Sequence, residues 1–271
     1  MYRIAIITVN YNNKRGLEET INSVRNQSCK DFEFIVVDGA STDGSIELLR
    51  NNIDIISEYV SEKDTGIFNA MNKGVKMATS EYLIFLNSGD SFVDTEVVRN
   101  LYAQDFDADI LQGDSICTKK GVFNHIWRAP KYITCNTFYS GSLSHQSAII
   151  RKALFDKTPY DETLRIAADK KFFFEQLIIH GASYRKLNMQ VARFDVEGIS
   201  NNLMFEEKKE QENRKIIEAL PSIWLFDYDD YIGNRTELER WVYENRNSIL
   251  VKMLSMWFLL CKKIKRRMYI K

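Results

Sequence analysis

Cysteine is scarce in this sequence, and the few cysteines form no recognisable pair. The four are Cys29, Cys117, Cys135 and Cys261, and no two of them stand at a C-x-x-C spacing. A chain of 271 residues can bury a large core and needs no disulfide staples. The pattern argues against a disulfide scaffold and predicts a protein of a reducing, cytoplasmic compartment.

An excess of charge of one sign is also absent, since 37 Lys and Arg residues balance 37 Asp and Glu residues. No overall field therefore favours nucleic acid as a partner. Long apolar runs are missing near the start, where MYRIAIITVNYNN offers only six apolar or nearly apolar residues in a row. This is too few for a secretory signal peptide, so we expect the chain to begin directly with a core strand.

The first ninety residues alternate between strand-like and helix-like segments. Short runs rich in β-branched and aromatic residues occur at 3–9, 32–38, 55–60 and 82–87. Between them, 16–27 and 66–78 carry apolar residues at helical spacing. The alternation predicts an α/β domain with a parallel sheet covered by helices on both faces. Later in the chain we expect strands at 108–117, 121–127 and 184–196, a strand running into a helix at 142–155, and a helix at 166–181.

Acidic residues follow three of the predicted strands at the point where each strand ends. They are Asp38 in VVDGAS, Asp64 in SEKDTG and Asp90 in LNSGDSF. Ligands of open parallel sheets bind outside the carboxyl ends of the strands, so these loops should share one edge. Asp38 and Asp90 are flanked by small residues that let a ligand approach the backbone, although an ordinary turn is the alternative for each.

Glycine-rich nucleotide loops are absent from the end of the first strand. Neither G-x-G-x-x-G nor G-x-x-x-x-G-K-[ST] occurs there, and Asn10-Tyr11-Asn12 stands in their place. A nucleotide would therefore be held by side chains and a metal ion. The carboxylate of Asp90 suits Mg²⁺ or Mn²⁺, with substrate phosphates supplying further ligands.

Five segments together carry a family resemblance. TVNYNN, VVDGASTDGS, SEKDTGIFNAMNKGVKMATSEYLIFLNSGDSF, SHQSAIIRKALF and RIAADKKFFFEQL follow one another in this order between about residues 2 and 200. In this order and spacing they resemble the bacterial family-2 glycosyltransferases, of the surface-polysaccharide or colanic-acid-type group. The resemblance implies a GT-A fold, which is a Rossmann-like, mostly parallel sheet, together with a nucleotide-sugar donor, UDP by the family's habit, and an inverting reaction.

The resemblance also implies roles for individual residues. Asp38 would hydrogen-bond the nucleobase or ribose, with Asn10 and Tyr11 lining the same pocket and Asp64 also lying at the nucleotide. Asn87 and Ser88 would lie at the donor, and Asp90 would bind the metal as the last carboxylate of an Asp-x-Asp-type motif. Asn87 and Gly89 stand where many relatives carry Asp, so the donor diphosphate would supply most of the metal's ligands.

An inverting transfer needs a base for the acceptor hydroxyl, and Asp169 is the candidate. It matches the acidic position of the family at the head of the helix that continues as KKFFFEQL, although an acid there could simply cap that helix. His145, in SHQS, lies between the metal loop and the base in sequence, and a pocket or metal-ligand role is as well supported as a structural one.

Three regions are expected along the chain: a catalytic domain at 1–203, a charged helical extension at 204–247 and a basic amphipathic helix at 248–271. The apolar core of the last region, 249–261, is shorter than the ~20 residues of a membrane span and contains Lys252. It suits an interfacial helix attracted to anionic lipid, which would place the protein on the inner face of the cell membrane. Docking on the catalytic domain or on a second subunit is the alternative.

Three functions compete on this evidence. The first is an inverting glycosyltransferase acting on a glycan or a lipid-linked sugar in surface-polysaccharide assembly. The second is a sugar nucleotidyltransferase, whose glycine-rich, Arg-containing signature near the first strand is missing here. The third is a non-catalytic relative that binds nucleotide sugars, for which the reduced metal motif is the only support.

Overall fold

The computed structural model describes residues 2–139, 141–196 and 206–218. A compact unit runs from Met1 to Ile216, and it includes the start of the charged region expected to follow the catalytic domain. The region 248–271, expected to be an amphipathic helix, lies outside the described residues. The boundaries expected at 203 and 247 therefore stay predictions.

The strands of this unit form one mixed sheet. They are β1 (Ile4–Asn10), β2 (Glu33–Asp38), β3 (Glu58–Ser61), β4 (Tyr82–Phe85), β5 (Ser91–Phe92), β6 (Ile110–Lys119), β7 (Val122–Trp127), β8 (Ala148–Arg151) and β9 (Tyr184–Asp195). Their order is β3-β2-β1-β4-β8-β6-β9-β5, with β7 paired to β6. The first four run parallel, as the alternating pattern predicted. Beyond them, β8 runs antiparallel to both β4 and β6, whereas β6 and β9 are parallel.

Helices join the strands. They are α1 (Lys14–Arg25), α2 (Ser45–Arg50), α3 (Ile67–Met77), α4 (Val97–Tyr102), α5 (Cys135–Tyr139), α6 (Ala153–Lys157), α7 (Ala168–Phe174) and α8 (Glu206–Glu218). A 3₁₀ turn, η1 (His145–Ser147), precedes β8, and a π-helical turn, η2 (Glu175–Ile179), continues α7. The helix predicted at 166–181 is therefore real but changes its hydrogen-bond period at Glu175.

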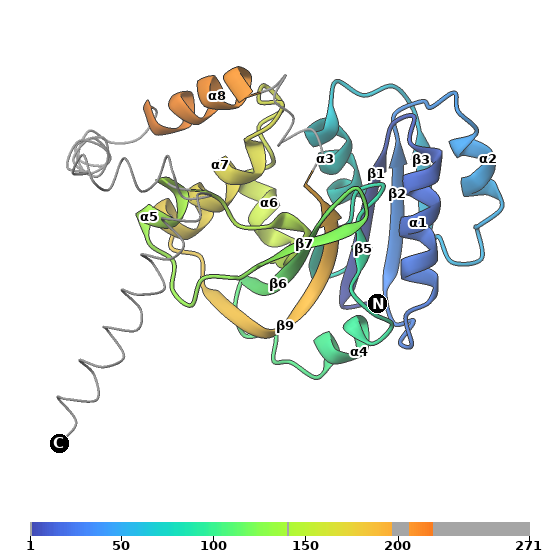
Figure 1. Ribbon diagram of the computed structural model, residues 1–271, viewed down its shortest axis with the longest axis horizontal. Coiled ribbons are helices and arrows are strands. Elements are labelled where there is room, and N and C mark those ends of the chain that lie inside the picture. Colours follow the sequence, from blue (N-terminus) through green and yellow to red (C-terminus); the bar gives the residue numbers. More distant parts are fainter. Residues whose placement is uncertain (1, 140, 197–205, 219–271) are drawn as a thin grey trace. The chain divides into compact units, whose positions relative to one another are not determined.

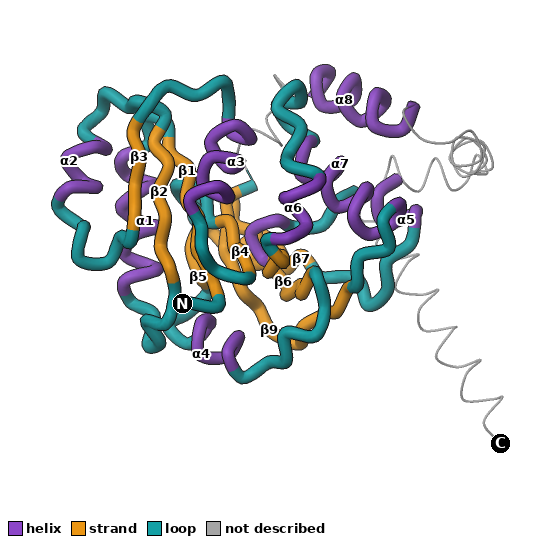
Figure 2. The backbone as a smooth tube through the Cα atoms, turned by 180° about the vertical axis from the view of Figure 1, so that it is seen from behind, coloured by secondary structure: helices purple, strands orange, loops and turns teal. Residues whose placement is uncertain are grey.

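Successive side chains of each strand point to opposite faces of the sheet, so the core has a part on each face. Ile4 and Ile6 of β1 face the apolar stripe of α1, Leu17, Ile21 and Val24. The odd-numbered Ile7 faces α3, where a Cβ at Gly74 would lie 2.5 Å from its Cγ2. The helices α1 and α3 accordingly cover opposite faces (Figures 1 and 2). This confirms the predicted α/β layering.

An aromatic cluster joins the later helices to β4. Phe85, at the end of β4, contacts Phe155 of α6 and Tyr160 edge-on. Phe155 stacks on Phe172 of α7, with ring centroids 4.3 Å apart and planes 14° from parallel. Aromatic pairs of this kind add to the energy of burial and fix relative orientation. The cluster therefore sets the start of α7 beside the carboxyl end of β4.

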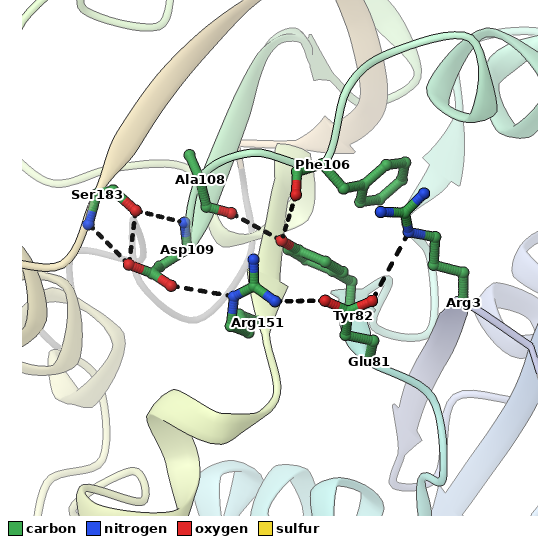
Figure 3. Close-up of polar contacts among 8 residues, drawn as sticks. All are labelled: Arg3, Glu81, Tyr82, Phe106, Ala108, Asp109, Arg151 and Ser183. Atoms are coloured by element: carbon green, nitrogen blue, oxygen red, sulfur yellow. Dashed lines mark hydrogen bonds and ion pairs between the residues drawn. The ribbon is translucent and has the colours of Figure 1, made fainter.

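The opposite, amino edge of β4 is closed by a charged network (Figure 3). Arg151 of β8 bonds Glu81 and donates to Asp109 at 3.0 Å, and its guanidinium lies 4.7 Å from the Tyr82 ring centre. Asp109 also accepts from the hydroxyl of Ser183 at 2.6 Å. Each charge here has a protein partner, so this cluster locks strands together rather than forming a second site.

Candidate active site

A buried hydrogen-bond cluster closes the carboxyl ends of β1, β2 and β3. Strand register sets Asn10 beside Asp38 and Asp38 beside Ser61. One carboxylate oxygen of Asp38 accepts from Asn10 Nδ2 (2.8 Å) and from the Ser41 hydroxyl (2.6 Å). The other accepts from the Ser41 backbone N–H (2.9 Å) and the Ser61 hydroxyl (2.6 Å). Four donors thus fill the roughly four acceptor positions of a carboxylate.

This cluster holds Asp38 ionised. Burial alone would raise the pKa of Asp38, but the hydrogen bonds from Ser41, Ser61 and Asn10 outweigh it and lower the pKa below its ordinary value. Since its acceptor positions are all in use, a nucleobase or ribose would bond Asp38 only by replacing one of these donors. Ser61 is only partly buried, which makes its hydroxyl the donor most easily replaced.

Tyr11, Gly39 and Asp64 meet on the outer side of this cluster. A Cβ built at Gly39 would lie 2.5 Å from Asp64 Oδ2 and 3.1 Å from Tyr11 Cδ2. Asp64 is fixed by accepting from the Gly66 backbone N–H at 2.9 Å, and the Tyr11 ring is 68% exposed. The structure therefore brings together the expected nucleotide-site residues Asn10, Tyr11, Asp38 and Asp64, with an exposed ring beside a carboxylate.

The loop Asn87–Asp90 is held by the start of α1. Asn13, the N-cap residue of α1, donates from Nδ2 to the Ser88 carbonyl at 2.9 Å and accepts from Gly16 N through Oδ1. Gly89, at φ +106°, donates its N–H to the Thr20 hydroxyl at 3.0 Å. That hydroxyl lies 2.7 Å from the Asp90 carbonyl. A left-handed backbone at Gly89 lets the chain turn so sharply that both sides of the loop bond to one helix.

The carboxyl group of Asp90 is buried at the tip of this loop. Only 9% of the residue is exposed, and Oδ2 accepts from the Asn87 backbone N–H at 3.0 Å. Burial raises the pKa of Asp90 to about 7, although the nearby His145 and the hydrogen bonds act in the opposite direction. A cation beside this carboxylate would favour its ionised form.

His145 connects the loop Asn87–Asp90 to Asp169. Its Nδ1 lies 3.0 Å from Asp169 Oδ2, and its Nε2 lies 3.3 Å from Asn87 Nδ2. Burial would lower the pKa of His145, but the hydrogen bond and charge of Asp169, together with the charge of Asp90, raise it above its ordinary value. The ring therefore lies between two carboxylates and orients one of them. The structure thus places His145 beside Asp169 and Asn87, and its functional role stays a prediction.

Asp169 lies in the first turn of α7 and uses its two oxygens differently. Oδ1 accepts from the Lys170 backbone N–H at 2.7 Å, while Oδ2 faces His145. Its side chain is 17% exposed, so solvent and an acceptor can reach it. Asp169 therefore makes a hydrogen bond at the start of the helix, as the capping alternative predicted, and also contacts His145 directly.

The residues expected to bind a divalent cation supply some, but not all, of the ligands that such an ion needs. The Asn87 Oδ1 atom is buried without a hydrogen-bond partner, and it belongs to the loop that carries Asp90. These two side chains offer hard oxygen donors of the type that Mg²⁺ and Mn²⁺ prefer. Within the described part of the chain, no group of three or more His, Cys, Asp or Glu residues could hold an ion. Any metal here would need ligands from the substrate.

Sequence reasoning missed the small polar residues that build the site. Ser41 and Ser61 bind Asp38, while Asn13 and Thr20 hold the loop Asn87–Asp90. Ser41, Ser61 and Asn13 lie in or next to strand-end loops, where a serine or asparagine equally suits an ordinary turn. Thr20 lies in the middle of α1 and leaves no sequence signal. Across residues 2–139, 141–196 and 206–218, no helix is long and apolar enough to cross a membrane.

Comparisons with known proteins agree on one family. Residues 5–173 match the family described as "Glycosyl transferase family 2". A PGL/p-HBAD biosynthesis glycosyltransferase of Mycobacterium tuberculosis is 27% identical over 215 residues, which cover 76% of this chain and 82% of the relative. An uncharacterized glycosyltransferase of the same species is 28% identical over 216 residues, covering 73% and 77%.

Solved structures agree on the fold. TarS of S. aureus, in complex with UDP-GlcNAc, superposes with a TM-score of 0.66 at 20% identity, covering 88% of this chain and 74% of the other. The mannosyltransferase PcManGT of Pyrobaculum calidifontis, in complex with GDP-Man and Mn²⁺, gives 0.62 at 16% identity, covering 98% and 82%. Among the functions considered above, the family match selects the glycosyltransferase class. With its mixed sheet, its acidic strand ends and this match over most of the sheet, the chain belongs to glycosyl transferase family 2 and is a GT-A glycosyltransferase that uses a nucleotide-sugar donor.

Proposed function

We propose that this protein transfers a sugar, with inversion, from a nucleoside diphosphate donor to a hydroxyl of a glycan or lipid-linked acceptor in cell-surface polysaccharide biosynthesis. The observation that carries the proposal is the line of contacts from Asn87 through His145 to Asp169, which sets the strand-end loop of Asp90 next to an oriented carboxylate. UDP is the proposed nucleotide, supported by the UDP and UDP-GlcNAc complexes of the structurally similar TarS.

Asp169 is the proposed catalytic base. In a single displacement the acceptor oxygen bonds the anomeric carbon while the bond from that carbon to the diphosphate breaks, and the hydroxyl proton goes to a carboxylate. His145 holds Oδ2 of Asp169 at 3.0 Å, which limits rotation of the carboxylate and leaves it accessible to the acceptor. Orientation of this kind accounts for a large part of enzymatic rate enhancement.

The donor's nucleoside is proposed to lie over Tyr11, Gly39 and Asp64. The exposed Tyr11 ring offers a stacking face for a base, and Asp64 offers an acceptor for a ribose hydroxyl or a base N–H. Asn10 and Asp38 form the floor, where the amide and carboxylate are already bonded to each other at 2.8 Å. Asn87 and Ser88 continue this edge toward the donor phosphates.

Asp90 and the unpartnered oxygen of Asn87 would hold Mg²⁺ or Mn²⁺ together with the donor diphosphate. When bound, the ion would neutralise the charge that develops on the leaving diphosphate. The Mn²⁺ named in the PcManGT complex supports this choice of metal. A cation would also offset the burial that raises the pKa of Asp90 to about 7.

The region 248–271 is proposed to bind the inner face of the cell membrane. Counted over 244–271, Glu244 is the only acid against Arg246, Lys252, Lys262, Lys263, Lys265, Arg266, Arg267 and Lys271. Basic clusters beside an apolar stripe are attracted to anionic lipid. Such attachment would bring the site to a lipid-linked acceptor.

A thermal-shift panel tests the donor site without knowledge of the acceptor. Nucleoside diphosphates are added with and without Mn²⁺ to the wild type, to Asp90→Ala, and to Asp94→Ala, whose exposed side chain makes it the matched control. A ligand at about 100 times its Kd stabilises the native state by about 2.7 kcal/mol. We expect a metal-dependent shift with UDP in the wild type and in Asp94→Ala, and its loss in Asp90→Ala. No shift with any diphosphate would contradict the proposal.

A further inference from the structure

The helix α8 is polar on almost every side, so apolar burial alone does not explain its attachment. Its sequence EEKKEQENRKIIE has two isoleucines among charged and amide side chains. Between 207 and 216, only Glu212 and Ile216 are buried, at 2% and 6% exposure, and they lie one turn apart on a single face. A buried glutamate at the centre of a helix contact is costly unless its oxygens are well bonded.

Three backbone N–H groups supply those bonds. Glu212 Oε1 accepts from Arg165 N at 2.9 Å, and Oε2 accepts from Ile166 N at 2.9 Å and from Ala167 N at 3.0 Å. Three consecutive N–H groups that converge on one carboxylate form an anion-binding concavity. Charge-assisted bonds of this type are about twice as strong as neutral ones.

The three residues that donate these N–H groups lie just before the proposed base, Asp169, in the chain. Ala167 is the N-cap position of α7, and its own side chain makes no capping bond. Glu212 therefore binds the N–H of the N-cap residue, the group that the N3 side chain of a capping box would bind, from 45 residues further along the chain. Asp169 follows Ala167 by two residues, and its carboxylate must stay within 3.0 Å of His145 Nδ1. A shift of the 165–167 backbone moves Asp169 with it.

We propose that Glu212 is a positioning residue of the active site, whose carboxylate fixes the backbone of residues 165–167 and thereby the location of Asp169. The inference rests on the proposed function, in which Asp169 is the base. Glu212 is 2% exposed and bonded to three backbone N–H groups, so its proposed role is exerted through the backbone and not by contact with substrate. It makes α8 a part of the catalytic machinery, although α8 lies in the region expected from sequence to be an extension beyond the catalytic domain.

The test compares Glu212→Gln with Glu210→Gln, an exposed residue of the same helix. In Glu212→Gln an NH₂ group replaces one acceptor oxygen, so it opposes at least one of the three N–H groups. The readouts are UDP release from a panel of UDP-sugars with Mn²⁺, resolved into kcat and KM, and the thermal shift given by UDP. Misplacing a catalytic group by about 1 Å costs up to about a hundredfold in rate.

We expect kcat of Glu212→Gln to fall about ten- to a hundredfold while its KM and UDP shift match those of Glu210→Gln. A kcat within twofold of the control would overturn the inference, and so would a loss of UDP binding as large as the loss of rate. Should Glu212→Gln fail to fold, Glu212→Asp carries the same comparison, because it keeps the charge but falls one methylene short.

A double-mutant cycle separates this inference from the proposed function. If Glu212 acts through Asp169, Glu212→Gln adds little to the loss already caused by Asp169→Asn. Multiplicative losses would show that Glu212 acts by another route and would refute the inference alone. Full activity of Asp169→Asn would refute the proposed base, whereas an inactive Asp169→Asn beside a fully active Glu212→Gln would leave the base in place and remove Glu212.

Discussion

Asp38 joins the ends of three strands, so its replacement gives a quantitative test of the donor-site geometry. Asp38→Ala removes the acceptor of four bonds, whereas Asp38→Asn keeps the shape of the side chain. The Oδ1 atom of Asn10 is buried without a partner, so turning its amide over lets it accept from the new NH₂ group. The Ser41 hydroxyl can accept as well, because its hydrogen is free to rotate.

The two substitutions should therefore differ in free energy of unfolding. In Asp38→Asn the bonds to this side chain are kept in neutral form, at a cost of roughly 1 to 2 kcal/mol for lost charge assistance. Turning the Asn10 amide over also leaves its NH₂ group buried without an acceptor, which adds roughly 1 to 3 kcal/mol. In Asp38→Ala the backbone N–H and the hydroxyl of Ser41 both lose their acceptor, and Asn10 Nδ2 keeps only the Ser41 hydroxyl at 3.2 Å. The partly buried Ser61 hydroxyl can turn to solvent. Each stranded donor costs roughly 1 to 3 kcal/mol, so Ala, which strands one donor more than Asn, should destabilise by about 1 kcal/mol more.

Urea unfolding followed by tryptophan fluorescence at pH 7 measures this difference from the midpoints at equal m-value. Because the folded pKa of Asp38 is lowered, its contribution to stability is present above the unfolded pKa of about 3.9. It is lost as the pH falls through the lower, folded pKa, and the gap between wild type and Asp38→Asn should close there. Equal destabilisation by Asn and Ala at pH 7 would refute the argument that four internal bonds hold this carboxylate.

Three further predictions concern the site. Asp169→Asn should lower kcat by about 10² to 10⁴ while UDP binding, followed by thermal shift, is retained; a kcat near that of wild type would remove Asp169 as the base. Asp90→Asn should raise the melting temperature at pH 8 without metal. The folded pKa of Asp90 is raised to about 7, so its buried charge destabilises the fold fully above pH 7 and progressively less toward pH 4. Equal melting temperatures of the two proteins at pH 8 would contradict this prediction. Gly39→Ala should weaken UDP binding at least about tenfold in a titration, because its Cβ would lie 2.5 Å from Asp64 Oδ2, and unchanged affinity would move the nucleoside elsewhere.

Much of the sheet was readable from local pattern. The apolar runs at 3–9, 32–38 and 82–87 became β1, β2 and β4, because a strand buried on both faces needs continuous apolar residues. The run at 55–60 was placed too early, since β3 begins at Glu58. Ile56 is buried there, but its backbone N–H turns back to Asn52, so hydrophobicity alone did not mark the strand boundary.

Local sequence pattern does not predict which distant segments of the chain contact one another. The two-residue β5 is too short to leave a periodic signal, and the antiparallel direction of β8 depends on its neighbours in the sheet. His145 and Asp169 meet only in the folded chain, where η1 packs on β4 and α7 is linked to β4 through the Phe155 ring. Glu212 is one of five glutamates in α8, and only tertiary packing distinguishes it from the others.

The pairing of β5 with β9 has a consequence for how this enzyme is made. Ser91 and Phe92, directly after Asp90, bond to Arg193 and Ala192, about 100 residues later in the chain. At ~5 to 20 residues per second a ribosome needs roughly 5 to 20 seconds to synthesise that interval. Strands β1 to β4 and their helices can assemble from local contacts during this time. The segment after the loop Asn87–Asp90 still lacks β9, the strand with which β5 pairs. The part of the sheet that carries Asn10 and Asp38 can therefore form first, whereas the pairing of β5 that follows Asp90 is completed only after β9 has left the ribosome.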